Sequence, residues 1–155
     1  MRNAIIILPL LLAACGGGDG IEKQVRDPET GETTTVRAGS GVKAPDNLPV
    51  YAPIYRGATI ETSITNGAGA GKGLISFSVT EDPQTIIDFY RKRGADAGLK
   101  VMTEATVGGA RMLAMGGEGD GSAAMQVTVT TDEEEAGLTR VSLVYVAPDG
   151  DPPEG

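Results

Sequence analysis

Two stretches in the first half of the chain alternate apolar and polar residues. They cover residues 58–65 and 74–80. The residues that share one side are Ile60, Thr62 and Ile64 in the first stretch and Ile75, Phe77 and Val79 in the second. A period of two predicts strands with one buried face, and the glycine-rich loop at residues 66–73 predicts that they pair as a hairpin.

One helix is predicted after this hairpin, over residues 82–97. Asp82 is a good N-cap, and Pro83 suits the first helical position. Gly98 provides the C-cap. The apolar residues that recur at helical spacing are Ile86, Ile87, Tyr90 and Ala97.

Four more strands are predicted in the second half of the chain. They cover residues 99–106, 111–115, 123–131 and 138–147. The order is therefore two strands, one helix and four strands. This order predicts an α+β domain in which an antiparallel sheet of about five to six strands has one helix packed across a face.

The N-terminus has a different pattern, with a positive start, an apolar run at residues 4–14 and a small-residue exit. This order is typical of a secretory signal peptide. The run is shorter than the roughly 17 residues that a membrane-spanning helix needs, and it contains Pro9. We therefore expect residues 1–14 to be removed.

The end of that run, Leu12-Ala13-Ala14-Cys15, resembles the lipobox of bacterial lipoproteins. In that family the cysteine thiol receives diacylglycerol, the peptide is cut before the cysteine, and the new amino group is acylated, commonly with palmitate. Cys15 is the one cysteine of the chain, and an unpaired cysteine in an exported chain otherwise needs an explanation. The resemblance implies a mature protein that starts at acylated Cys15; the alternative is an ordinary signal peptide with an incidental cysteine.

The residue after the lipidated cysteine bears on location. In bacteria with two membranes, aspartate at that position holds lipoproteins in the inner membrane, whereas this chain has Gly16. The resemblance therefore implies the periplasmic side of the outer membrane. Two or three acyl chains make such an anchor effectively permanent.

Residues 15–45 are predicted to be the lipidated N-terminus and a flexible linker of Gly, Thr, Pro and mixed charge. As a coil of about 30 residues the linker would span roughly 30 Å. Two partly alternating arms, residues 22–26 and 33–37, flank a turn, but two strands alone are marginal in water. The domain is then expected over residues 46–147, followed by a disordered tail at 148–155.

Composition excludes several function classes. Removal of residues 1–14, which takes away Arg2, leaves 12 basic and 21 acidic side chains and a net charge of −9. Such a chain is a poor partner for nucleic acid and for anionic lipid surfaces. Histidine, the commonest acid–base group and metal ligand, is absent. We therefore expect no enzyme activity, no metal and no cofactor.

Four charged or glycine-rich motifs are interpreted as structural. The loop at residues 66–73 lacks the spacing of a phosphate-binding loop. The acidic segments 117–121 and 132–135 lack the spacing of a calcium loop. Arg91, Lys92 and Arg93 spread around the helix, which is typical of a solvated face.

A second resemblance covers residues 48–101. Its motifs are Tyr55-Arg56-Gly57-Ala58, the helix start Glu81-Asp82-Pro83 with Phe89-Tyr90 inside the helix, and Gly98-Leu99 before the next strand. These are similar to a domain of bacterial envelope proteins, whose pattern has proline in place of Arg56 and tryptophan in place of Leu99. The resemblance implies a fold and carries over no catalytic residue.

Gly94 departs from the helical pattern. It lies four residues after Tyr90, on the stripe that faces the sheet, and glycine in a helix costs about 1 kcal/mol relative to alanine. Three explanations stay open: a close approach of the sheet, a gap filled by methionine, or a cavity that a ligand could occupy. The candidate methionines are Met102, Met112, Met115 and Met125.

The sequence therefore predicts a membrane-anchored envelope lipoprotein that acts without catalysis. The main hypothesis is a protein-interaction module, attached to the membrane through the lipid on Cys15 and bound to an envelope protein. The alternative is a pocket protein that binds a small ligand beside Gly94, since methionine lines adaptable surfaces.

Overall fold

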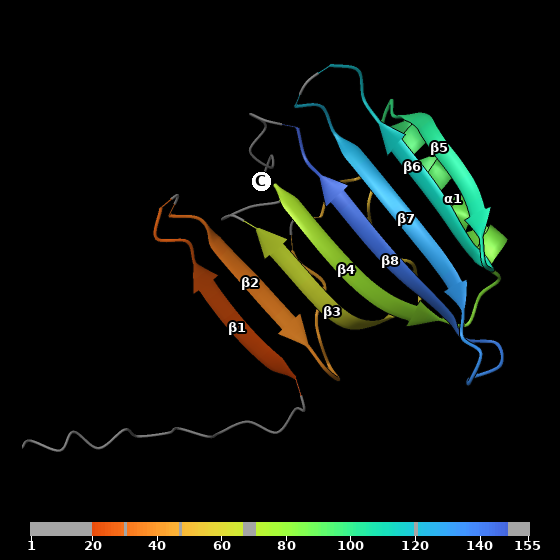
Figure 1. The fold of residues 1–155 in the computed structure, drawn as a ribbon, viewed down its shortest axis with the longest axis horizontal. Coiled ribbons are helices and arrows are strands. Elements are labelled where there is room, and N and C mark those ends of the chain that lie inside the picture. Colours follow the sequence, from red (N-terminus) through yellow and green to blue (C-terminus); the bar gives the residue numbers. More distant parts are fainter. Residues whose placement is uncertain (1–19, 30, 47, 67–70, 120, 149–155) are drawn as a thin grey trace, which may run out of the picture.

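The computed structural model describes residues 20–29, 31–46, 48–66, 71–119 and 121–148. These residues form an eight-stranded antiparallel sheet and one helix (Figure 1). The order across the sheet is β1-β2-β3-β4-β8-β7-β6-β5. The elements are β1 (Ile21–Arg26), β2 (Thr33–Ala38), β3 (Thr59–Asn66), β4 (Lys72–Val79), α1 (Pro83–Asp96), β5 (Lys100–Val107), β6 (Ala110–Gly116), β7 (Ala124–Thr131) and β8 (Thr139–Val146).

The predicted α+β fold with a sheet of about five to six strands is wrong, because the sheet has eight. The two additional strands, β1 and β2, lie in the stretch that was expected to be flexible linker. Strand β2 pairs along β3, with Val36 opposite Ile64. A hairpin that is marginal alone is stabilised when a third strand completes its hydrogen-bond ladder.

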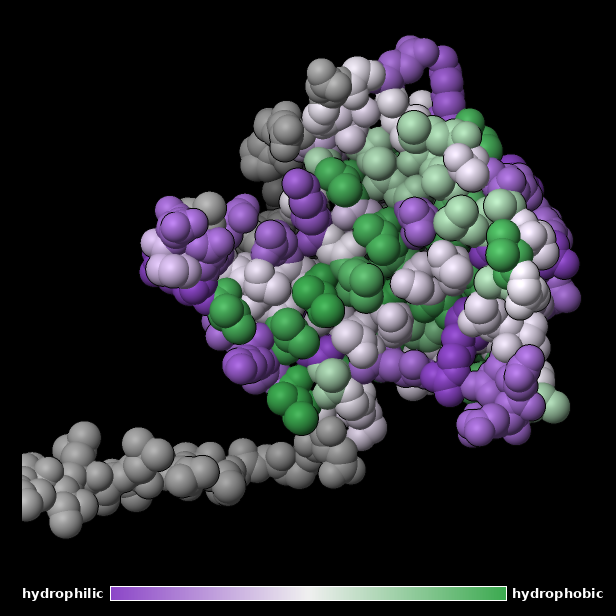
Figure 2. Space-filling view, viewed as in Figure 1, coloured by the Kyte–Doolittle hydropathy of each residue, from purple (hydrophilic) through white to green (hydrophobic). Residues whose placement is uncertain are grey.

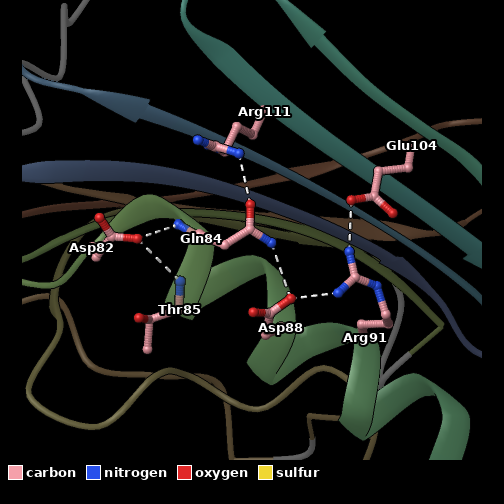
Figure 3. Close-up of polar contacts among 7 residues, drawn as sticks. All are labelled: Asp82, Gln84, Thr85, Asp88, Arg91, Glu104 and Arg111. Carbon is pink, nitrogen blue, oxygen red and sulfur yellow. Dashed lines mark hydrogen bonds and ion pairs between the residues drawn. The ribbon is translucent and has the colours of Figure 1, made fainter.

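The helix starts where its cap residues predict. The Asp82 carboxylate accepts hydrogen bonds from the amides of Gln84 at 2.8 Å and Thr85 at 3.4 Å, as Figure 3 shows. Pro83 follows the cap, and Gly98 adopts the left-handed conformation that ends the last turn. The helix packs against β5, β6 and β7, on the side of the sheet that is turned away in Figure 1.

One face of the sheet, here called the closed face, is covered by α1 and by residues 48–55. The Tyr90 hydroxyl donates a hydrogen bond to the Pro53 carbonyl at 2.8 Å, and the Tyr51 hydroxyl donates one to the Val146 carbonyl at 2.6 Å. Both bonds fasten this segment over the core. The most deeply buried strand residues on this face are Ile75, Phe77, Leu113, Val127, Val129, Leu143 and Tyr145.

A β-bulge in β3 changes which residues face the core. The register shifts between Ile60 and Thr62, so Ile60 and Ser63 are buried. Ile64 pairs with Leu74, whose neighbour Ile75 points into the core. Since neighbouring strand residues point to opposite faces, Ile64 lies on the other face. The predicted grouping of Ile60 with Ile64 is therefore wrong, because the bulge adds one residue to the alternation.

Candidate functional site: the open face of the sheet

The face of the sheet opposite α1, here called the open face, is not covered by any element that the structure describes. Figure 2 looks onto it and shows hydrophobic residues gathered across its middle. Pairing places four aliphatic residues side by side, since Val36 is opposite Ile64, Ile64 opposite Leu74, and Leu74 opposite Val144. With strands about 4.8 Å apart, this aliphatic row runs about 14 Å across the sheet. All four side chains are partly exposed.

Two shallow hollows flank the aliphatic row. One of about 250 Å³ is lined by Ile64, Leu74, Val144 and Val146 together with Lys72 and Gly73. The other, of about 170 Å³, lies over Met102, Ala114, Ala124, Gln126, Val144 and Val146. Each is smaller than the roughly 300 Å³ at which drug-sized ligand pockets begin. The hollows therefore suit single side chains or short aliphatic segments.

The open face carries cations although the chain is acidic, with a net charge of −8. Lys23 is opposite Val36, and Lys72 is opposite Val146. Neither lysine forms an ion pair with a residue in the described part of the chain. Arg140, by contrast, is neutralised by Glu61 at 3.0 Å and Asp132 at 2.6 Å. The unpaired charge beside the aliphatic row is therefore positive.

The space under Gly94 is occupied by methionine. A Cβ at Gly94 would lie 2.6 Å from the Met115 sulfur and 2.9 Å from the Met125 methyl carbon. Both methionines are buried, whereas Met102 is 71% exposed. Met115 and Met125 thus fill the gap that the small residue leaves.

The polar residues around α1 bind one another (Figure 3). Arg91 pairs with Asp88 and, at 2.6 Å, with Glu104 on β5. Gln84 donates to Asp88 at 3.0 Å and accepts from Arg111 on β6 at 2.6 Å. The Glu104 carboxylate is the main reason that the pKa of Arg91 is raised. These contacts attach the helix to the sheet edge.

The remaining sequence motifs have structural roles or lie outside the described residues. The Asp132 carboxylate accepts from the amides of Glu134 and Glu135, which with Arg140 lowers its pKa. Glu118 pairs with Lys100 at 2.6 Å. No group of metal-binding side chains occurs in the residues described.

The N-terminal predictions concern residues 1–19. The signal peptide, the lipobox and Cys15 therefore lie outside the described residues, as do residues 67–70 of the glycine-rich loop. None of the helices in the described ranges is long and apolar enough to cross a membrane.

The open face is the part of the site that the sequence did not reveal. Its row depends on β2, β3, β4 and β8, of which β8 is far from the others in the sequence. The β3 bulge also reverses the expected direction of Ile64. One indication was present, because Val36 lies in a partly alternating arm beside the turn at residues 27–32.

Comparison with protein-family models matches residues 59–146 to a START domain-like family. The match runs from β3 to the end of β8 and covers more than half of the chain. Searches of the curated proteins and of the solved structures found no match. Strands β1 and β2 lie outside the matched residues. Because the match covers more than half of the chain, the chain belongs to the START domain-like family.

Proposed function

We propose that this protein is a membrane-anchored envelope lipoprotein that acts as a non-catalytic binding module through its open face. The observation that carries the proposal is the aliphatic row of Val36, Ile64, Leu74 and Val144, which no described element covers. A continuous apolar area on a soluble domain is typical of an interaction surface. The lipid on Cys15 supplies the anchor, and the periplasmic side of the outer membrane is the expected location.

The chemistry of the open face suits a protein partner with aliphatic side chains and carboxylates. Aliphatic groups of the partner would fill the two hollows beside Val144 and Val146. Its carboxylates would lie near Lys72, where opposite charge favours the correct register. Catalysis is not part of the proposal.

Crosslinking in cells tests this proposal by position. A photo-crosslinking amino acid replaces Gln126, which is exposed and lies opposite Val144, at the end of the aliphatic row. The matched control replaces Lys92, which is exposed on the helix at the other side of the sheet. We expect a discrete protein adduct from the Gln126 position and none from Lys92. Equal adducts from both positions, or none from either, would contradict the proposal.

A second candidate is the binding of a small apolar ligand, which the family relationship favours because this kind of fold is suited to holding ligands. The supporting observation is that Met115 and Met125 pack closely against Gly94. Methionine is flexible and repacks readily, so a ligand could replace these two side chains under the helix. A thermal-shift screen with apolar small molecules tests it, and Gly94→Leu should then abolish any stabilisation without changing crosslinking from the Gln126 position.

A further inference from the structure

The sheet begins much closer to the lipid attachment residue than the linker prediction implied. Strand β1 starts at Ile21, so six Cα-to-Cα steps separate it from Cys15. Six steps span at most about 22 Å, even when fully extended. If Cys15 carries the lipid, as the proposed function holds, the start of β1 cannot leave the vicinity of the bilayer surface.

Strand β1 also has the composition of a surface that contacts lipid. Ile21 is 72% exposed and Val25 is 50% exposed, and both are apolar. Lys23 lies between them on the same side of the strand, because alternate strand residues share a face. On the opposite side, Glu22 is paired with Arg37 at 3.0 Å. The open side of β1 therefore presents two aliphatic groups and one unpaired cation.

We propose that the open side of β1, formed by Ile21, Lys23 and Val25, lies on the phospholipid surface to which Cys15 is anchored. The aliphatic side chains enter the boundary between headgroups and acyl chains, and the lysine stem follows them while its ammonium stays with the phosphates. This contact holds the sheet in one orientation on the membrane. A domain on a long linker would instead move freely. It rests on the lipid anchor of the proposed function.

The membrane contact leaves the Leu74 and Val144 end of the aliphatic row accessible. Neighbouring strands in a sheet are rotated by roughly 20 to 25°, and four such steps lead from β1 to β8. This twist turns the face of β8 away from that of β1. When β1 lies on the lipid, Leu74 and Val144 are three and four strands away from it, on the part of the open face that is left for a partner.

Tryptophan fluorescence on vesicles tests the proposal, because the chain has no tryptophan of its own. The mature chain, residues 15–155, is coupled through the Cys15 thiol to a maleimide lipid in vesicles of phosphatidylglycerol and brominated phosphatidylcholine. Single variants carry Val25→Trp on the open side of β1, Gln24→Trp on its other side, or Val107→Trp on β5. Val107 is 73% exposed and lies on the opposite edge of the sheet.

We expect the Val25→Trp variant alone to show a blue-shifted emission that is quenched by the brominated acyl chains. Adding Lys23→Glu should reduce both effects. Equal quenching in all three variants, or none in any, would overturn the proposal. A blue shift at Val25→Trp without bromine quenching would also overturn it, because it indicates a protein contact at β1.

The chemical attachment makes this test independent of acylation in the cell. Fatty-acid labelling of the wild-type chain and of Cys15→Ser tests acylation separately. The experiments can therefore disprove the lipid contact of β1 without disproving the acylation of Cys15, and the reverse.

Discussion

Tyr145 on β8 lies directly over Gly73 on β4. The two residues are paired across the strands, and a Cβ at Gly73 would be 2.4 Å from the tyrosine oxygen and 2.5 Å from the ring carbon that carries it. Tyr145 is 1% exposed. The ring thus covers a strand position that has no side chain. Both residues line the hollow that Ile64 and Leu74 also line.

This relationship predicts that Gly73→Ala destabilises the fold. The added methyl group must move a packed aromatic ring, and overpacking of this kind costs about 1 to 3 kcal/mol. Gly116→Ala is the matched control, because its Cβ would meet mainly the sulfur of the exposed Met102. Urea denaturation of both variants should show a lower midpoint for Gly73→Ala only. Equal midpoints would contradict the close contact.

At Gly94 we expect a larger side chain to be unfavourable. Gly94→Leu must displace Met115 and Met125 from a filled space, with a cost of about 1 to 3 kcal/mol. Gly94→Ala should change stability little, since flexible methionine ends can move and alanine improves helix propensity by about 1 kcal/mol. Differential scanning calorimetry measures both. A higher melting temperature for Gly94→Leu would mean that the site is a void.

The buried tyrosines predict a loss of stability at alkaline pH. Burial raises the pKa of Tyr51 from 10.0 to about 12 and also raises the pKa of Tyr90 and Tyr145. A group whose pKa is raised by folding favours the neutral form in the folded state. Its stabilising effect is therefore complete below pH 10 and declines between pH 10 and about 12.

Tyr51→Phe isolates one of these groups. The variant loses the hydrogen bond to the Val146 carbonyl, at a cost of about 1 kcal/mol. In exchange, its stability should fall less steeply from pH 10 to pH 12 than that of the wild type. The urea midpoints of both proteins are measured across that pH range. If the midpoints of the variant and the wild type fall in parallel, ionisation of Tyr51 does not contribute to the loss of stability.

Hydrogen exchange should divide the sheet into a slow and a fast part. Strands β4, β7 and β8 carry the buried core, whereas every residue of β1 is exposed and β1 pairs with β2 alone. Local opening is easiest where few apolar contacts are lost. We expect amides of β1 to exchange first and those of β4 and β8 last, measured by mass spectrometry. Equal protection of β1 and β8 would be inconsistent with this packing.

The parts of the fold that depend on local chemistry could be predicted from the sequence. The cap at Asp82, the glycine at position 98 and the strands β7 and β8 are set by neighbouring residues. The hairpin of β1 and β2 could not be assigned, because its stability comes from the free edge of β3. The bulge between Ile60 and Thr62 likewise has no marker in the sequence, and it hid the aliphatic row.

The central claim is that the open face binds a partner, and one substitution tests it most directly. Leu74→Lys places a charge in the middle of the aliphatic row while changing stability by no more than about 1 kcal/mol, since the side chain is already partly exposed. Val107→Lys introduces the same charge at an exposed valine outside the row.

The measurement is the yield of the adduct crosslinked in cells from the Gln126 position in these two backgrounds. The open-face account predicts that Leu74→Lys abolishes the adduct and that Val107→Lys leaves it unchanged, with both proteins folded and present at wild-type levels. An undiminished adduct in the Leu74→Lys background would contradict it.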